Sequence, residues 1–277
     1  MNYRHAFHAG NFADLVKHAA LTRLLARLMA DPSPLTVVDT HGGAGLYDLT
    51  DAHQARSKEA EAGVARLIGH DLPPAFDALV AAVEARNAPG KVETYPGSPS
   101  LILDALRPQD RYLACELRPD DHGRLGALLK RSGKPAQARL TDGYDAAVEM
   151  AREAEERLFV LIDPPFERPD DYVRIVETLG EVLKAKPRAT VLVWLPLKDL
   201  ETLDGYVRRL EALNLPRTVV AEARLKPLHD PMKMNGCVLT ATGAPKGFEA
   251  ELQTICEAVV TSLGAPDGKA KVWSVGG

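Results

Sequence analysis

Short segments that read as strands alternate regularly with helical stretches between residues 111 and 212. The predicted strands fall at about 111–115, 136–140, 158–162 and 190–195, and the predicted helices at about 119–130, 145–156, 169–184 and 199–212; the strand at 158–162 is a continuous apolar run. Such apolar runs are typical of buried parallel strands, and consecutive parallel strands need a crossover that is usually helical. The alternation therefore predicts an α/β fold on a mostly parallel sheet.

Three further strands complete a predicted sheet of seven. They lie at 35–38, 217–225 and 236–241, and a helix at 248–263 follows the last of them. Before the first strand, Asn11 can cap a helix that runs to about residue 30. Its apolar stripe includes Leu15, Leu21, Leu24, Leu25 and Leu28.

The interval between the first two predicted strands is too long for one crossover helix. It holds two helical stretches, at about 54–69 and 74–87, separated by a Pro-rich break at 71–74. We expect one domain over residues 1–277, with residues 50–93 forming an inserted helical subdomain that stays out of the sheet.

Charge and cysteine content exclude several classes of protein. A net charge of −4 gives no overall positive field, so a nucleic acid would have to bind a local basic patch. The chain shows no signal-peptide pattern and no apolar run of membrane length, so we expect no membrane partner. The three cysteines are widely separated and fit neither a disulfide framework nor a zinc site. We expect a cytoplasmic protein without a metal.

An acidic residue follows each of the first four predicted strands. Asp39 precedes a Gly-rich turn at 40–45, and Glu116, Asp142 and Asp163 follow the next three strands. Ligands of open α/β sheets bind outside the carboxyl ends of the strands. Each acid alone could be an ordinary turn residue, but independent turns would not place an acid at all four ends. The set predicts a ligand site.

The residue types at these strand ends suit a nucleoside. The Glu116 carboxylate can accept hydrogen bonds from both hydroxyls of a ribose. Asp142 can accept from an adenine amine, while Gly143 leaves room for the ring. In the Gly-rich turn, Gly43 and Gly45 allow the backbone to turn sharply and approach a ligand.

Asp163-Pro164-Pro165-Phe166, directly after the strand at 158–162, adds a reactive end to this site. Proline fixes its own φ and has no N–H, so the carbonyls of Asp163 and Pro164 can face the site as free acceptors. Phe166 adds a flat ring. An acid, a fixed carbonyl and a ring together suit a planar base that carries an exocyclic amine.

The first residues of the chain are rich in His and aromatic side chains. The spacing of His5 and His8 matches no defined zinc signature, so we favour contact with RNA over a metal site. Aromatic rings stack on bases and basic side chains contact phosphate. We expect residues 1–12 to form an RNA-contacting segment, with Tyr3 and Arg4 binding substrate.

Several motifs together resemble the bacterial 23S ribosomal RNA adenine-N6 methyltransferase J family. They are Tyr3-Arg4-His5 with His8-Ala9-Gly10-Asn11, Asp39-Thr40-His41, Tyr95-Pro96-Gly97-Ser98-Pro99, Asp142-Gly143 and Asp163-Pro164-Pro165-Phe166. The resemblance spans nearly the whole chain. It implies a seven-stranded, Rossmann-like fold that depends on S-adenosylmethionine, has a small helical insertion and acts on 23S rRNA before the subunit is fully assembled.

The resemblance also implies roles for individual residues. Asp163 would be catalytic, and Pro164 and Phe166 would contact the substrate base. Phe166 replaces the Tyr of many relatives, which keeps the ring but loses a phenol hydroxyl. The expected cofactor-binding residues are His18, His41, Ser98, Glu116, Asp142, Gly143 and Asp163.

Other functions share parts of this pattern. A DNA adenine or protein amide methyltransferase would use the same tetrapeptide, and only the N-terminal residues favour rRNA. A non-catalytic RNA-binding module on the same fold would not need an intact Asp163 motif. A nucleotide-dependent oxidoreductase would place an acid about 20 residues after the glycines, and none ends a predicted strand there.

Overall fold

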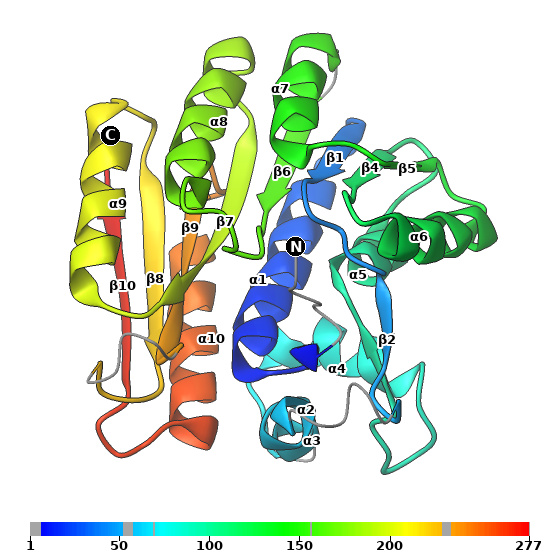
Figure 1. The fold of residues 1–277 in the computed structure, drawn as a ribbon, viewed down its shortest axis with the longest axis vertical. Coiled ribbons are helices and arrows are strands. Elements are labelled where there is room, and N and C mark those ends of the chain that lie inside the picture. Colours follow the sequence, from blue (N-terminus) through cyan, green and yellow to red (C-terminus); the bar gives the residue numbers. More distant parts are fainter. Residues whose placement is uncertain (1–6, 52–57, 69, 156, 229–233, 277) are drawn as a thin grey trace.

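The computed structural model describes residues 7–51, 58–68, 70–155, 157–228 and 234–276. An eight-stranded sheet forms the centre of the described fold, in the order β10-β8-β9-β7-β6-β1-β4-β5 (Figure 1). Its strands are β1 (Leu35–Asp39), β4 (Arg111–Cys115), β5 (Ala136–Arg139), β6 (Arg157–Ile162), β7 (Thr190–Leu197), β8 (Thr218–Arg224), β9 (Gly236–Thr242) and β10 (Lys269–Val275). The five strands from β5 to β7 pair in parallel, and β9, β8 and β10 extend the sheet in antiparallel pairs.

Helices cover both faces of this sheet. Two separate apolar clusters fill the space beneath them, one under α1, α5, α6 and α10 and the other under α7, α8 and α9 (Figure 1). The bounds of these helices are α1 (Phe12–Met29), α5 (Ser98–Ala105), α6 (Pro119–Ser132), α7 (Gly143–Glu153), α8 (Asp171–Ala185), α9 (Leu200–Ala212) and α10 (Phe248–Leu263). The α/β class predicted from the alternation is confirmed.

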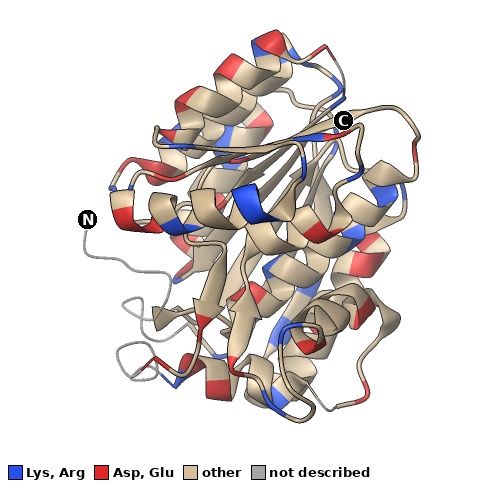
Figure 2. Cartoon of the chain, turned by 90° about the vertical axis from the view of Figure 1, so that its right-hand side faces the viewer, with Lys and Arg blue, Asp and Glu red and all other residues tan. Residues whose placement is uncertain are grey.

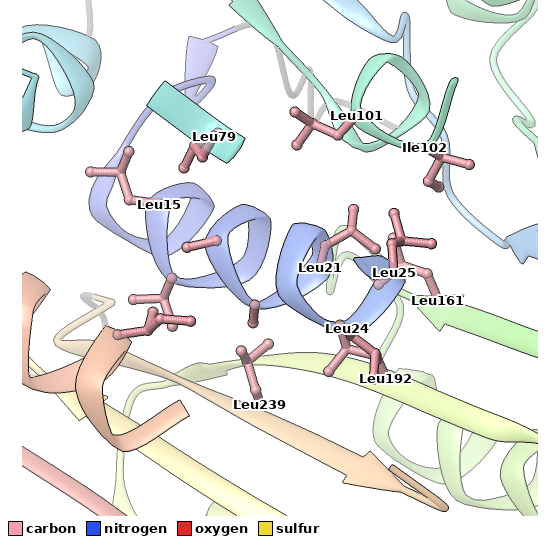
Figure 3. Packing of buried hydrophobic residues seen from close by; sticks show 14 of the residues in the cluster. Leu15, Leu21, Leu24, Leu25, Leu79, Leu101, Ile102, Leu161, Leu192 and Leu239 are labelled. Atoms are coloured by element: carbon pink, nitrogen blue, oxygen red, sulfur yellow. The ribbon is translucent and has the colours of Figure 1, made fainter. Parts of the chain in front are cut away.

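Helix α1 lies in the middle of one apolar cluster. The Asn11 side chain accepts from the backbone N–H groups of Ala13 and Asp14, so it caps the helix as predicted. All five leucines of the predicted stripe are buried. Figure 3 shows leucines of α1 between Leu101 of α5 on one side and Leu192 and Leu239 of the sheet on the other. A helix that is apolar nearly all round must be buried in this way.

The predicted total of seven strands is wrong by one. All seven predicted strands are present, but β10 adds an eighth by pairing with β8 over its whole length. Lys269 and Lys271 interrupt the apolar residues of β10, as expected of a partly exposed edge strand, so its sequence does not have the pattern of a buried strand. A separate two-stranded sheet pairs β2 (Leu46–Asp48) with β3 (Thr94–Pro96).

The described part of the segment between β2 and β3 contains short helices and lies beside the N-terminal half of α1. It contains α2 (Glu59–Ala62), α3 (Val64–Leu67), a 3₁₀ turn (Pro74–Phe76) and α4 (Asp77–Glu84) (Figure 1). The helical stretch predicted at about 54–69 is divided, in its described part, into α2 and α3. The break falls at Gly63, where a Cβ would lie 2.2 Å from the carbonyl oxygen of Gly10. No strand joins the main sheet among the described residues from 51 to 93.

The connectivity creates a crevice beside β1. The chain passes from β1 to β4 and β5 on one side, then to β6 and β7 on the other. Loops that leave the carboxyl ends of neighbouring strands in opposite directions leave a gap, where such sheets bind ligands. In the described part of the chain, no helix has both the length and the apolar character needed to cross a membrane.

Candidate active site

A cavity of about 410 Å³ opens at this edge of the sheet, within the usual range for small-molecule sites. Its lining includes every described residue of the predicted set: His18, His41, Ser98, Glu116, Asp142, Gly143, Asp163, Pro164 and Phe166. Tyr3 and Arg4 lie outside the described residues. The structure therefore brings together side chains that are up to 148 positions apart in the chain, between His18 and Phe166.

Asp39, at the end of β1, organises the cavity from below without lining it. Its carboxylate is fully buried and accepts from Ser98 Oγ at 2.7 Å and from the His41 backbone N–H at 3.2 Å. Burial is the main reason that the pKa of Asp39 is raised to about 6. The hydroxyl of Ser98 is thus committed to Asp39.

His41 presents a neutral imidazole to the cavity. Burial lowers the pKa of its ring to about 4, against weaker opposing effects of Asp163 and Asp142. Its Nδ1 lies 2.7 Å from Thr40 Oγ1, and its ring meets the Tyr144 ring edge-on at 5.0 Å. These contacts fix the imidazole in a single orientation.

Glu116 joins two loops at the end of β4. One carboxylate oxygen accepts from the Gly43 backbone N–H at 3.0 Å, and the other accepts from the Arg118 backbone N–H at 2.7 Å. Gly43 has φ +59, a conformation that favours glycine. Burial raises the pKa of Glu116 above its usual value. The carboxylate is therefore fixed in place while still lining the cavity.

Asp142 and Gly143 form the start of α7. Asp142 Oδ1 caps the helix by accepting from the Tyr144 backbone N–H at 3.0 Å, and its Oδ2 accepts from Arg174 at 2.7 Å. Burial disfavours the charged carboxylate, but the hydrogen bond and charge of Arg174 prevail and hold its pKa below the usual value. A Cβ at Gly143 would lie 1.9 Å from the Thr40 carbonyl oxygen, so only glycine fits there.

His18 lines the cavity and is almost fully buried. Its Nδ1 is 2.8 Å from the Tyr95 hydroxyl, and the two rings stack with centroids 5.5 Å apart. Tyr95 belongs to β3, so this contact joins α1 to the small two-stranded sheet.

Asp163 is held by a buried lysine that the sequence did not point to. The Lys17 ammonium lies 2.5 Å from Asp163 Oδ2 and 2.8 Å from Asp14 Oδ1. Burial opposes the charge on Lys17, but the attraction of both carboxylates prevails and raises its pKa well above the usual value. Lys17 thus stays protonated, and this cluster carries one net negative charge when all three groups are ionised.

Phe166 has the left-handed backbone conformation that non-glycine residues rarely adopt, with φ +51. Its ring packs against Tyr172 and Trp194, with centroids 4.9 Å and 5.8 Å away. Such strain persists where surrounding contacts hold it, and it is concentrated at binding sites. The aromatic cluster fixes the ring as part of the cavity wall.

The sequence carried only a weak sign of the missed residues. Asp14 and Lys17 lie three positions apart in a helix whose other residues are mostly apolar, and both are buried. Charged residues are almost never buried unless paired, so such a pair is a sign of a site. Arg174 and Trp194 gave no comparable sign. Among the described residues, no group of three or more His, Cys, Asp or Glu side chains could hold a metal ion.

The fold and the cavity define the class of protein. A parallel sheet with an antiparallel extension carries Glu116, Asp142 and Asp163 in one cavity at its carboxyl edge. This is the arrangement of methyltransferases that use S-adenosylmethionine.

Comparison with known proteins identifies the family. The family described as "Ribosomal RNA large subunit methyltransferase D, RlmJ" matches residues 32–275, so the chain belongs to it. Two similar proteins are named "Ribosomal RNA large subunit methyltransferase J". The Escherichia coli protein is 29% identical, and the match covers 92% of this chain and 91% of that protein. The Haemophilus influenzae protein is 30% identical, and the match covers 99% of this chain and 98% of that protein. A crystal structure from Legionella pneumophila has a TM-score of 0.88 and 29% identity, covering 97% of this chain and 98% of that one.

Proposed function

We propose that the chain transfers a methyl group from S-adenosylmethionine to the N6 amine of an adenine in 23S rRNA, with Asp163 as the catalytic residue. The observation that carries this proposal is the cavity, in which Glu116 and Asp142 follow strands on one side of β1, and Asp163 with Pro164 follows the strand on the other side. The family membership and the names of the relatives support rRNA as the substrate.

The residues of the cavity suit the cofactor. Glu116 offers carboxylate oxygens for ribose hydroxyls, and Asp142 offers an acceptor for the adenine amine beside the space left by Gly143. His41, His18 and Ser98 would surround the methionine part. When bound, S-adenosylmethionine supplies a methyl group that is already activated for transfer.

The Asp163 end suits an amine that becomes positively charged. The Asp163 carboxylate and the Pro164 carbonyl would accept hydrogen bonds from the target amine and orient it toward the methyl group. Asp14 balances the charge of Lys17, so Asp163 leaves a net negative charge at this end. That charge favours the positive charge growing on the amine.

The aromatic wall suits a base that has left its stack. Phe166 and Trp194 both line the cavity, and an aromatic surface compensates for the stacking that a flipped base loses. The base would then enter with its amine toward Asp163.

RNA contact outside the cavity would involve a small area. Figure 2 shows basic and acidic residues interspersed along the elements seen from that side, as expected for a net charge of −4. We assign RNA contact to residues 1–12, with Tyr3 and Arg4 as the main groups, and to the helical insertion at 50–93. A small footprint fits action in the cytoplasm on rRNA that is not yet fully assembled.

Labelled cofactor tests these assignments together. Naked 23S rRNA should accept the label at adenine N6, whereas assembled large subunits, DNA and protein should accept much less. Methylation of DNA or protein in preference to rRNA would support an alternative substrate, and binding of rRNA without transfer would support a non-catalytic module.

A chain that lacks residues 1–5 tests the N-terminal assignment. It should bind the cofactor normally but fail to methylate rRNA, because the deletion removes only the RNA contacts. Normal methylation by the shortened chain would contradict the assignment of Tyr3 and Arg4.

A further inference from the structure

We propose that Arg174 is a positioning residue that fixes Asp142 and Tyr144 for recognition of the adenine amine of the cofactor. This inference rests on the proposed role of Asp142. Arg174 belongs to α8 and does not line the cavity, whereas Asp142 and Tyr144 both do. It therefore acts on the cofactor only through these two residues.

The guanidinium of Arg174 makes three contacts with the start of α7. Its Nη1 donates to Asp142 Oδ2 at 2.7 Å, and its Nη2 donates to Asp145 Oδ1 at 3.1 Å. Its central carbon lies 4.6 Å from the centroid of the Tyr144 ring. A planar group with several donors can hold two acidic side chains and one ring in a fixed relative geometry.

These contacts leave Asp142 able to serve a ligand. The helix cap takes one lone pair of Oδ1 and Arg174 takes one of Oδ2. A carboxylate has about four acceptor positions, so at least one remains on the partly exposed side that lines the cavity. Because the Tyr144 N–H and Arg174 already hold both oxygens, binding of an amine does not carry the entropy cost of ordering the Asp142 side chain.

Tyr144 is held equally well. Its hydroxyl donates to the buried Asp171 at 3.0 Å, and the His41 ring contacts it edge-on. With Arg174 over its face, the ring is restrained on three sides. The aromatic wall next to Asp142 is thus rigid before the cofactor binds.

The surroundings of Asp142 show why one arginine matters. Nη1 of Arg168, from the loop after the Asp163 motif, lies 3.6 Å from Asp142 Oδ2, and the Arg168 side chain is 44% exposed. It therefore stabilises the Asp142 carboxylate less than Arg174 does, which is closer and 19% exposed. Asp145 and Asp171 add negative charge nearby, and His41 faces Asp142 as a neutral ring. Arg174 is accordingly the main group that keeps Asp142 charged as an acceptor.

A pair of ligands that differ at one group tests this role. We would measure Kd by calorimetry for S-adenosylhomocysteine and for its 6-unsubstituted purine analogue, in which a hydrogen replaces the adenine amine. Arg174→Met should weaken binding of S-adenosylhomocysteine by roughly tenfold, the scale of one charge-assisted hydrogen bond. Binding of the analogue should change by about twofold or less, since it has no amine to donate to Asp142.

The controls separate positioning from general damage. Arg174→Lys keeps the charge and should restore part of the preference for the amine. Arg152 belongs to α7, on the same face of the sheet as α8, and its side chain is 65% exposed. Arg152→Met should change the affinity for neither ligand. Equal loss for both ligands, or no loss for either, would overturn the proposal.

A further variant distinguishes this inference from the proposal on which it rests. Asp142→Ala should abolish the preference for the amine. If Asp142→Ala keeps that preference, the proposed role of Asp142 is wrong. If Asp142→Ala loses it and Arg174→Met keeps it, only the role of Arg174 is wrong. Neither measurement needs rRNA.

Discussion

The two ends of the cavity are held by different kinds of contact. At the end proposed to hold the cofactor adenine (the adenine end), Glu116 and Asp142 each accept from the backbone N–H two positions further along the chain, so local turns orient both carboxylates. At the Asp163 end, the carboxylate instead contacts the ammonium of Lys17, 146 positions earlier in the chain. The adenine end therefore has a local component set by strand-end turns, whereas the other end forms only when α1 is packed in place.

Replacing Lys17 should have the largest effect on stability. Lys17→Met leaves Asp14 and Asp163 facing each other without a cation, so the free energy of unfolding should fall by about 3–5 kcal/mol. Urea denaturation would measure this. Lys184→Met, at an 80% exposed lysine that also has an acidic partner, should change stability very little. If Lys17→Met has only a small effect on the free energy of unfolding, the Asp163 end does not depend on Lys17 and the proposed difference between the two ends is wrong.

Replacing Asp163 should impair the reaction rather than the fold. Asp163→Ala leaves Lys17 paired with Asp14, so stability and cofactor affinity should largely survive. Single-turnover methylation of an rRNA fragment should slow by roughly 100-fold, the scale of losing one preorganised electrostatic partner. Asp163→Asn should be milder, because the amide oxygen still accepts from the amine.

Asp170→Ala, in the same loop, provides the matched control for Asp163 and should react at the normal rate. Near-normal turnover of Asp163→Ala would identify Asp163 as a turn residue.

Replacing Glu116 should affect the adenine end alone. Glu116→Ala should weaken binding of S-adenosylhomocysteine by about 1–3 kcal/mol, because the ribose hydroxyls lose their acceptors and the Gly43 N–H is left unpaired. Calorimetry would measure this, with Glu149→Ala as a control at a 51% exposed glutamate. Unchanged affinity would remove Glu116 from the ribose role.

The smallest expected effect is a change in the pH dependence of stability. The folded-state pKa of His41 is lowered to about 4, so unfolding takes up a proton between pH 4 and pH 6.5. The stability that neutral His41 provides is present above pH 6.5 and is lost as pH falls through this window. As pH falls from 6.5 to 5, the free energy of unfolding of His41→Asn should decrease by about 1–2 kcal/mol less than that of the original chain. Urea denaturation at several pH values would measure this. The same loss of stability with falling pH in both proteins would contradict the prediction.

The two ends of the cavity also differ in how much of each could be predicted from the sequence. Strand-end acids such as Glu116 and Asp142 could be predicted because a strand and the residue after it are adjacent in the chain. Lys17 could not be assigned to Asp163, because helical spacing says which face a residue occupies and not which distant loop packs there. Arg174 looked like an ordinary exposed residue of an amphipathic helix.

The fold itself was predictable where burial was complete. The strands at 158–162 and 190–195 read as nearly continuous apolar runs because helices cover both faces of the sheet there. The edge strand β10 carries lysines and did not read as a strand. The break at Gly63 depends on a close approach to Gly10, which local periodicity does not encode.

The central position of α1 has a consequence during protein synthesis. This helix leaves the ribosome before its strand partners do, since its leucines pack against Leu192 of β7 and Leu239 of β9 (Figure 3). At about 5–20 residues per second, roughly 10–40 seconds pass between synthesis of the helix and of its last strand partner. During that time the leucines of this helix lack their final partners, so the nascent chain exposes apolar surface that promotes aggregation until β9 is made.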